Sequence, residues 1–225
     1  MDEKTKEILE QQTTRFHVQK STQRTSVDLK VDLKEEGKYF RAAFLKAEPK
    51  FDITRADKNI LNSIFAWVWR LDWCNKLGLD YDKGLFLYGS LGLGKTMTLR
   101  ALQIYMNHLK AKGFDDNRLG MYRRSASVLA NIFAVDGQPA LIQYTTDNLC
   151  VDELGREPIP TSSYGTKMNV LQYLFQLRYE RRKEYVTHVT TNLTMDKIVP
   201  IYGDYIADRF LEMFNFIEFK GDSLR

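Results

Sequence analysis

The segment 89–96 constrains this chain more than any other feature of its sequence. It reads Gly-Ser-Leu-Gly-Leu-Gly-Lys-Thr and matches G-x-x-x-x-G-K-[ST], the pattern of a phosphate-binding loop. An apolar run over residues 84–88 precedes it and predicts a buried strand, and residues 96–107 predict a helix. A strand, a glycine-rich loop and a helix in this order form the arrangement that phosphate binding requires.

Each residue type of this loop has a physical role in holding phosphate. Glycine lets the backbone adopt positive φ and approach an anion closely, and amides at a helix N-terminus attract negative charge. We expect Lys95 to reach the β- and γ-phosphates of a nucleoside triphosphate, and the Thr96 hydroxyl to bind Mg²⁺. The alternative is a glycine-rich turn that matches by chance. The predicted nucleotide-binding residues are Gly89, Ser90, Leu91, Gly92, Leu93, Gly94, Lys95, Thr96 and Met97.

Strand and helix patterns alternate along the chain beyond this loop. Strands are predicted at 119–122, 148–151, 185–191 and 214–219, and helices after Ser125 or Ser127, at 167–182 and at 203–213. This alternation predicts an α/β fold, with a parallel sheet of about five strands and helices on both of its faces. Ligands of such sheets bind beyond the carboxyl ends of the strands.

Residues 1–50 differ in character from residues 51–225, which we expect to form the main domain. They are polar and charge-mixed, so we expect an appendage that orders on a partner, or else a plain disordered tail. Apolar and polar residues alternate over 27–33, which is compatible with a short strand. A helix is predicted over about 52–77, and its tryptophans are expected to pack in the core; the alternative is that one stacks on a nucleotide base.

The second chemical signature is the run Leu149-Cys150-Val151-Asp152-Glu153, a buried strand that ends in two adjacent carboxylates. We expect Asp152 to hold Mg²⁺, directly or through water. Glu153 projects in a different direction and is a candidate to polarise the attacking water. One acid for the metal and one for the nucleophile is the arrangement expected of hydrolysis.

Two later residues are candidates for contact with the γ-phosphate. Asn192 ends a predicted strand and could hydrogen-bond the phosphate or the water; the alternative is a cap for the helix near Met195. Arg209 could supply a guanidinium to the active site of a neighbouring subunit. Its alternative is a surface salt bridge with Asp208 or Asp204.

Composition excludes several other classes of protein. The chain of 225 residues has two cysteines, Cys74 and Cys150, and three histidines without metal-ligand spacing, so a disulfide framework and a zinc site are not expected. No apolar run approaches the roughly 18 residues of a membrane span, and the polar N-terminus does not match a signal peptide. We therefore expect a cytoplasmic protein without a membrane partner. The net charge of +4 permits nucleic-acid binding without demanding it.

The motifs together resemble a known family. The loop, Val151-Asp152-Glu153, Thr190-Thr191-Asn192-Leu193, Ala207-Asp208-Arg209-Phe210 and Gly221-Asp222-Ser223-Leu224-Arg225 occur in the order seen in AAA+ ATPases of the DnaC/IstB type. The resemblance covers about residues 50–225 and implies ATP and Mg²⁺ as cofactors. It implies Walker A roles for Lys95 and Thr96, Walker B roles for Asp152 and Glu153, and a sensor role for Asn192. Arg209 matches the arginine finger and Arg225 a second sensor near the nucleotide. The chain stops at Arg225, so no sizeable helical lid is expected.

The resemblance implies a helicase loader in DNA replication that assembles into a ring or helical filament with ATP. The partners would be a replicative helicase and single-stranded DNA. Alternatives are a transposition helper that binds duplex DNA and a transposase, a nucleotide-dependent scaffold with little hydrolysis, and a small-molecule kinase. Basic clusters at Arg123-Arg124 and at Arg178, Arg181, Arg182 and Lys183 could contact nucleic-acid phosphates, or could be solvated faces with internal ion pairs.

Overall fold

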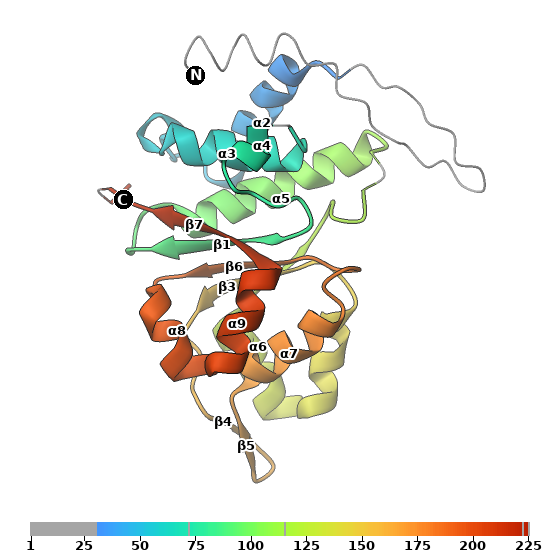
Figure 1. Cartoon of the computed structure of the whole chain (residues 1–225), viewed down its shortest axis with the longest axis vertical. Coiled ribbons are helices and arrows are strands. Elements are labelled where there is room, and N and C mark those ends of the chain that lie inside the picture. The colour runs from blue at the N-terminus through green and yellow to red at the C-terminus, as the bar shows by residue number, and fades with distance from the viewer. Residues whose placement is uncertain (1–30, 72, 115, 222, 225) are drawn as a thin grey trace, which may run out of the picture. The chain divides into compact units, whose positions relative to one another are not determined.

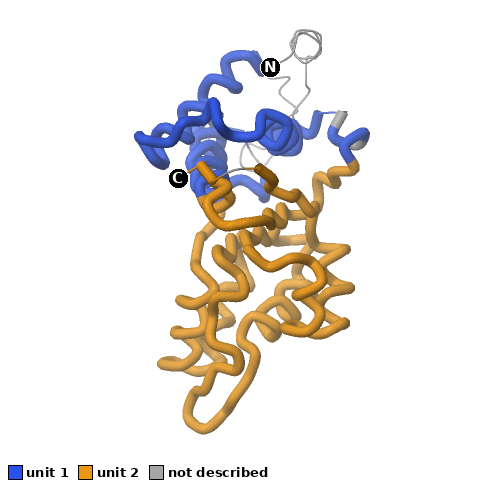
Figure 2. Tube along the Cα trace, turned by 90° about the vertical axis from the view of Figure 1, so that its left-hand side faces the viewer, with its two compact units in different colours: residues 1–77, 97–120 blue, residues 78–96, 121–225 orange. Residues whose placement is uncertain are grey.

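The structure, a computed structural model, describes residues 31–71, 73–114, 116–221 and 223–224. These residues divide into two compact units (Figure 2). Unit 1 contains residues up to 77 together with 97–120, and unit 2 contains 78–96 together with 121 onward. The expected division of the chain into an appendage, 1–50, and a main domain, 51–225, stays a prediction, because these compact units are not the same as domains.

Unit 2 is built on five parallel strands in the order β2-β3-β6-β1-β7 (Figure 1). This confirms the expected α/β fold with a five-strand parallel sheet. The strands that end near the candidate site, β3 and β6, are almost entirely buried, as expected where both faces of a parallel sheet are covered. The strand bounds are β1 Gly84–Gly89, β2 Tyr122–Ser125, β3 Leu149–Leu154, β6 Thr187–Thr191 and β7 Phe214–Phe219.

Strand order differs from chain order, and this difference assembles the site. Strand β6 lies between β3 and β1, although many residues separate these three strands in the sequence. Because parallel strands end at the same edge of a sheet, the loop after β1, the acids of β3 and Asn192 after β6 belong to one edge. The sheet therefore brings together residues that the sequence keeps apart.

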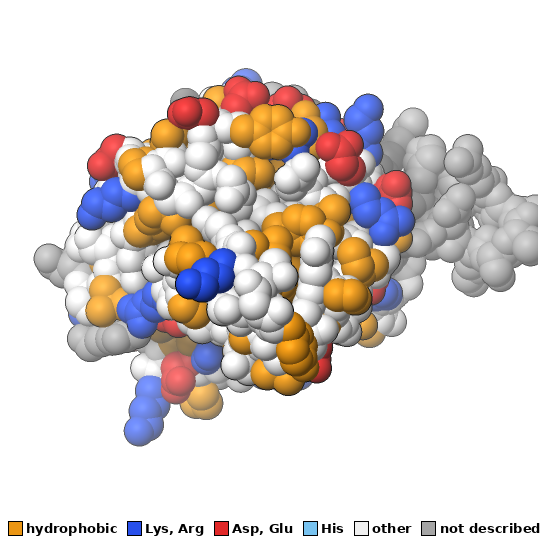
Figure 3. Space-filling model, turned by 90° about the horizontal axis from the view of Figure 1, so that it is seen from below, with side chains coloured by type: hydrophobic (Ala, Val, Ile, Leu, Met, Phe, Trp, Pro, Cys, Tyr) orange, Lys and Arg blue, Asp and Glu red, His pale blue; other side chains and the backbone are white. Residues whose placement is uncertain are grey.

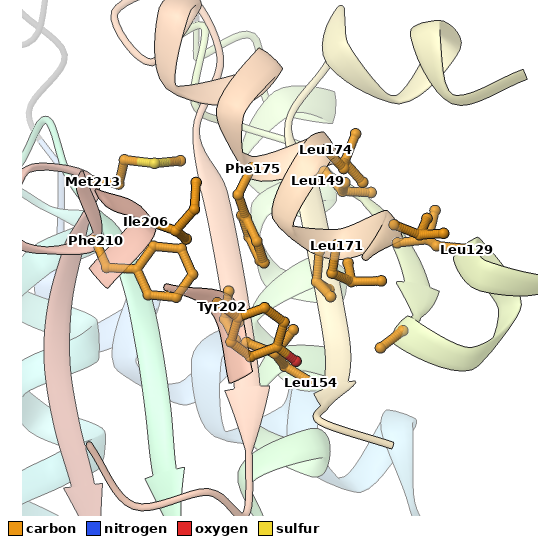
Figure 4. Close-up of a cluster of buried hydrophobic side chains, with 14 of the residues drawn as sticks. Leu129, Leu149, Leu154, Leu171, Leu174, Phe175, Tyr202, Ile206, Phe210 and Met213 are labelled. Carbon is orange, nitrogen blue, oxygen red and sulfur yellow. The ribbon is translucent and has the colours of Figure 1, made fainter. Parts of the chain in front are cut away.

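Helices of unit 2 pack an apolar cluster against the sheet (Figure 4). Leu171, Leu174 and Phe175 of α7 and Phe210 of α9 are fully or almost fully buried in it. Ser125 and Asn169 cap α6 and α7, each accepting a backbone N–H with its side chain. The bounds are α6 Ala126–Asp136, the 3₁₀ segment η2 Gln138–Thr145, α7 Val170–Glu180, α8 Met195–Tyr202 and α9 Asp204–Met213.

Two expectations about element bounds in unit 2 are wrong. The helix expected from residue 167 begins at Val170, because Asn169 caps it and residues Thr166–Met168 form strand β5 of a hairpin with β4, Thr161–Ser163. The second strand lies at Tyr122–Ser125 rather than 119–122. Neither boundary has a hydrophobic signal, since the hairpin is short and β2 alternates between exposed and half-buried residues.

Unit 1 is helical and corrects two further expectations. Asp32 caps a helix, α2 (Leu33–Ala47), so the strand expected at 27–33 does not extend through Leu33, and residues 27–30 lie outside the described residues. The single helix expected at 52–77 is broken into η1 (Ile53–Arg55), α3 (Lys58–Val68) and α4 (Trp73–Lys76). Arg70, with φ of 48°, lies at the second break.

Helix α5, Lys95–Ala111, starts in unit 2 and continues in unit 1. Trp67 and Trp69 are 1% exposed, which confirms the expected core packing for these two tryptophans, while the side chain of Trp73 lies outside the described residues. Trp69 donates its indole N–H to Tyr105 of α5 at 2.8 Å. None of the helices in the described part of the chain combines the length and the apolar character that crossing a membrane needs.

Candidate nucleotide-binding site

The glycine-rich loop follows β1 and leads directly into α5. Gly92 and Gly94 both have φ of 86°, a conformation in which a Cβ would be strained. Gly89 is constrained by space as well, because a Cβ there would lie 2.2 Å from the carbonyl oxygen of Phe219 in β7. The glycines are therefore required by the backbone itself, which argues against a chance match to the pattern.

The Lys95 side chain is folded onto its own loop. Its Nζ donates to the carbonyl oxygens of Gly89 at 2.7 Å and Ser90 at 2.6 Å. Lys95 is 6% exposed, and burial lowers the pKa of its amino group from 10.5 to about 8. Because the partners of this buried ammonium among the described residues are neutral carbonyls, it is suited to an anion, which fits a phosphate at the loop.

Asp152 is the centre of the polar contacts around the loop. Its Oδ1 accepts the hydroxyl of Thr96 at 2.8 Å and that of Thr190 at 2.6 Å. Its Oδ2 accepts Nη1 of Arg123 on β2 at 2.9 Å. Asp152 is 4% exposed, so three donors satisfy a carboxylate that burial would otherwise penalise. Thr190 and the Arg123–Asp152 pair were not predicted, since no local pattern reports a contact between neighbouring strands.

Glu153 lies at an irregularity of the sheet. The β3–β6 pairing is regular to Val151↔Val189 and resumes at Leu154↔Thr191, so two residues of β3 oppose one of β6. Glu153 itself has φ of 59°, a left-handed conformation that costs a non-glycine residue about 1–2 kcal/mol. Its carboxylate is 43% exposed and lies 3.7 Å from Arg156. The bulge thus points the second acid away from the buried first one.

The donor set fits Mg²⁺ bound together with a triphosphate. Magnesium prefers oxygen ligands and is usually held by one or two carboxylates plus substrate phosphates, rather than by a cage of protein ligands. The hydroxyl of Thr96 and the carboxylate of Asp152 supply such oxygens. Over the described residues there is no group of three or more His, Cys, Asp or Glu suited to a metal.

Asn192 follows β6 and is exposed. The capping alternative for Asn192 is wrong, because the N-cap of α8 is Thr194. The threonine before it, Thr191, donates to the carbonyl of Leu154 at 2.7 Å and accepts the N–H of Leu193 at 3.0 Å. Neither bond involves Asn192, whose side chain is exposed and open to a ligand.

Arg209 of α9 lies between two aromatic rings. Its guanidinium carbon is 3.5 Å from the ring centroid of Tyr205 and 4.3 Å from that of Tyr179. Its acidic neighbour is Glu180, with Nη2 3.6 Å from Oε1, rather than the expected Asp208 or Asp204. Within the described residues its Nη1 is buried without a hydrogen-bond partner. The guanidinium is therefore preoriented by stacking and keeps donor capacity.

Two other predicted site residues give less information. Arg225 lies outside the described residues, but the backbone N–H of Leu224 before it donates to the carbonyl of Gly92 at 2.9 Å. The segment 223–224 therefore contacts the glycine-rich loop. Met97 is the third residue of α5.

Internal contacts of several basic side chains argue against part of the expected nucleic-acid binding by the two basic clusters. Arg178 is 1% exposed and donates to Thr187 and to backbone carbonyls, including those of Asp147 and Val186, so it is a structural residue. Arg123 forms an ion pair with Asp152. Arg181 pairs with Glu184 and Arg182 with Glu212, which confirms the alternative of internal ion pairs for these two arginines. On the face drawn in Figure 3, Lys and Arg are dispersed among apolar and acidic side chains rather than gathered in one patch.

Comparisons with solved structures identify the fold. A protein described as a primosome component from Streptococcus pyogenes serotype M3 is 17% identical, with a TM-score of 0.51 over 82% of this chain and 99% of that one. DnaI is 20% identical (TM-score 0.53, 82% and 93% covered), and the DnaC helicase loader is 18% identical (TM-score 0.50, 81% and 99% covered). No family model and no curated protein matches the chain. The chain thus has the AAA+ P-loop fold of these proteins.

Proposed function

We propose that this protein binds ATP with Mg²⁺ and hydrolyses it to ADP and phosphate. The observation that carries the proposal is the hydrogen bond from Thr96, at the end of the glycine-rich loop, to Asp152, at the end of a different strand. A phosphate loop joined to a carboxylate in this way is the constellation that binds a metal–triphosphate complex. A protein that only binds nucleotide would not need the second acid, Glu153, so its presence supports hydrolysis.

Each side chain has a defined task in this proposal. Lys95 exchanges the carbonyls of Gly89 and Ser90 for the β- and γ-phosphates. Thr96 and Asp152 would hold Mg²⁺, which would neutralise charge on the phosphates. Glu153 accepts a proton from the attacking water, and Asn192 orients that water or the γ-phosphate.

Arg209 completes the site from a neighbouring subunit. A guanidinium offered to the γ-phosphate stabilises the charge of the transferred group and is worth roughly 10³–10⁵ in rate where it has been measured. Stacking between Tyr179 and Tyr205 prepares Arg209 for this task. Because the contact is head-to-tail, it generates a ring or a helical filament, and ATP favours that assembly.

We further propose that the protein is a helicase loader that assembles on single-stranded DNA during replication. This part is supported by the likeness to the DnaC helicase loader and to DnaI, whose fold covers four-fifths of the chain. At 17–20% identity the likeness concerns fold, so the partner needs its own experiment.

Steady-state hydrolysis measurements test the enzymatic part. Glu153→Gln and Arg209→Ala are each expected to lose at least about 100-fold in kcat. The matched control is Arg182→Ala, which also removes an arginine stacked on Tyr179 and paired with a glutamate, Glu212. Mixing the two inactive variants should restore turnover, because the Glu153→Gln subunit lends its arginine to the intact site of the Arg209→Ala subunit. Wild-type turnover in both variants contradicts the mechanism, and mixtures without activity contradict the action across subunits.

A pull-down tests the loader assignment. The Glu153→Gln protein, held in ATP, is used as bait in a lysate of the host, with the Lys95→Ala protein as control. Recovery of a hexameric replicative helicase with the first bait alone supports the loader. Recovery of a transposase, or binding to duplex DNA in preference to single-stranded DNA by fluorescence anisotropy, contradicts it in favour of a transposition helper.

A further inference from the structure

Thr190 contacts both acidic residues of the candidate site. Its hydroxyl donates to Oδ1 of Asp152 at 2.6 Å and accepts the backbone N–H of Glu153 at 2.9 Å. The directions follow from the chemistry, because a backbone N–H only donates and an ionised carboxylate only accepts. Thr190 is 1% exposed. One buried side chain on β6 therefore holds the carboxylate of one acid and the backbone of the other.

The backbone of Glu153 needs such a restraint. It lies in the bulge of β3, where a regular ladder partner for its N–H is lost, and its φ is 59°. Non-glycine residues keep this conformation only where the surrounding structure imposes it. The Thr190 hydroxyl supplies the missing acceptor, and the direction of the Glu153 side chain follows from the backbone that it stabilises.

The contacts of Asp152 indicate which step depends on Thr190. Asp152 keeps two other donors, Thr96 and Arg123, when the Thr190 hydroxyl is removed. For the Glu153 N–H, Thr190 is the acceptor that the structure provides. Loss of the hydroxyl should therefore disturb the proposed base, Glu153, more than the metal-binding acid.

We propose that Thr190 is a positioning residue for hydrolysis, which sets the direction of Glu153 and so controls turnover rather than nucleotide affinity. The inference rests on the proposed ATP hydrolysis and extends it to a residue on the neighbouring strand. Thr190 lies on β6, and Asn192 follows the end of this strand two residues later. A movement of β6 would therefore displace both Asn192, the proposed contact of the γ-phosphate, and Glu153, the proposed base.

The chain offers a matched control in the adjacent residue. Thr191 is also 1% exposed and its hydroxyl also makes two hydrogen bonds, to the carbonyl of Leu154 and from the N–H of Leu193. Thr191→Val removes a buried hydroxyl from the same strand without touching a bond to Asp152 or Glu153. A general weakening of β6 would therefore affect both variants, whereas positioning of Glu153 would affect Thr190→Val alone.

The experiment measures kcat and KM for ATP, and the Kd of a fluorescent ATP analogue, for four proteins. Thr190→Val should lose about 10–100-fold in kcat, the range found for residues that orient a reacting group, with Kd within about threefold of wild type. Thr190→Ser, which keeps the hydroxyl, and Thr191→Val should retain kcat within about threefold. A wild-type kcat in Thr190→Val, an equal loss in Thr190→Ser, or an equal loss in Thr191→Val overturns the proposal.

The rate of amide hydrogen exchange at Glu153, monitored by NMR, measures the restraint on its backbone N–H independently of ATP turnover. Thr190→Val should accelerate exchange of this amide at least about 10-fold, while Thr190→Ser and Thr191→Val should leave it protected. Unchanged protection in Thr190→Val overturns the positioning role whatever the rates show. Absence of hydrolysis by the wild-type protein overturns the proposed function instead, and the exchange rates then still test the contact between Thr190 and Glu153.

Discussion

The hydroxyl of Thr96 donates a hydrogen bond of 2.8 Å to Oδ1 of Asp152, across 56 residues of sequence. The bond joins the end of the glycine-rich loop to the end of β3 and defines the centre of the candidate site. The Thr96 hydroxyl and the Asp152 carboxylate are both proposed to bind one Mg²⁺. Substitution of either residue should therefore lower the affinity of the site for this metal.

Removing the Thr96 hydroxyl should weaken the contribution of Mg²⁺ to nucleotide affinity. Thr96→Val deletes a proposed ligand and leaves Asp152 one donor short, so we expect the Mg²⁺-dependent gain in ATP affinity to fall about 10-fold or more. Fluorescence titration of a labelled ATP analogue, with Mg²⁺ and with a chelator, measures this gain. Thr96→Ser should behave as wild type, and an unchanged gain in Thr96→Val would exclude the proposed metal site.

Nucleotide binding should take up a proton in mildly alkaline solution. Burial lowers the pKa of Lys95 to about 8, so the free protein has largely lost this proton at pH 9. A bound phosphate favours the ammonium form and returns the proton, whereas at pH 7 the proton is already present. Calorimetric titrations in two buffers of different ionisation enthalpy should show uptake approaching one proton at pH 9 and little at pH 7. Lys95→Arg is the control, since an arginine stays charged and should show no such difference.

The same pKa predicts a gain in stability when the charge of Lys95 is removed. Its folded-state pKa is below the ordinary 10.5, so the unfolded chain binds more protons between about pH 8 and 10.5, and the stability due to this group rises with pH across that window. Below pH 8 the full cost of the buried charge is present. Lys95→Met should therefore raise the free energy of unfolding at pH 7 without nucleotide by about 1–3 kcal/mol.

Chemical denaturation at several pH values checks this sign. The advantage of Lys95→Met should shrink as the pH approaches 10, where wild-type Lys95 is neutral as well. Added ATP with Mg²⁺ should reverse the order at pH 7, because only the wild type gains binding energy. A variant that is less stable than wild type at pH 7 without nucleotide contradicts the prediction.

One substitution, glycine to alanine, should have opposite effects at two positions. A Cβ at Gly84 in β1 would lie 1.6 Å from the carbonyl oxygen of Thr187 in β6, so Gly84→Ala must push two central strands apart. Gly37, inside α2, has nothing within 4 Å of such a Cβ. We expect Gly84→Ala to lower the free energy of unfolding by more than about 2 kcal/mol and Gly37→Ala to raise it by about 0.5–1 kcal/mol. Thermal and urea denaturation measure both, and an equal effect at the two sites would contradict the packing of β1 on β6.

The sequence alone determined the features that depend on a few neighbouring residues, such as the glycine-rich loop and the individual strands and helices. The glycine pattern of 89–96 and the apolar strand that ends in Asp152-Glu153 predicted the two segments that the fold brings together at the candidate site, because φ preference, helix N-terminal amides and burial act over a few residues. The alternation of strands and helices predicted the parallel sheet for the same reason. The long helix expected over 52–77 is broken at two places, and at the second of them Arg70 takes a left-handed backbone.

Tertiary structure alone decided which side chains meet. The order β2-β3-β6-β1-β7 places Arg123 and Thr190 on either side of Asp152. The packing of helices α7 and α9 places Glu180 rather than Asp208 beside Arg209. The packed fold also buries Arg178 of α7, which the sequence grouped with other basic residues. These contacts join residues up to 38 positions apart across neighbouring strands and helices. No propensity or periodicity reports them, because a hydrogen bond across a sheet depends on strand order and register, which only the packed fold establishes.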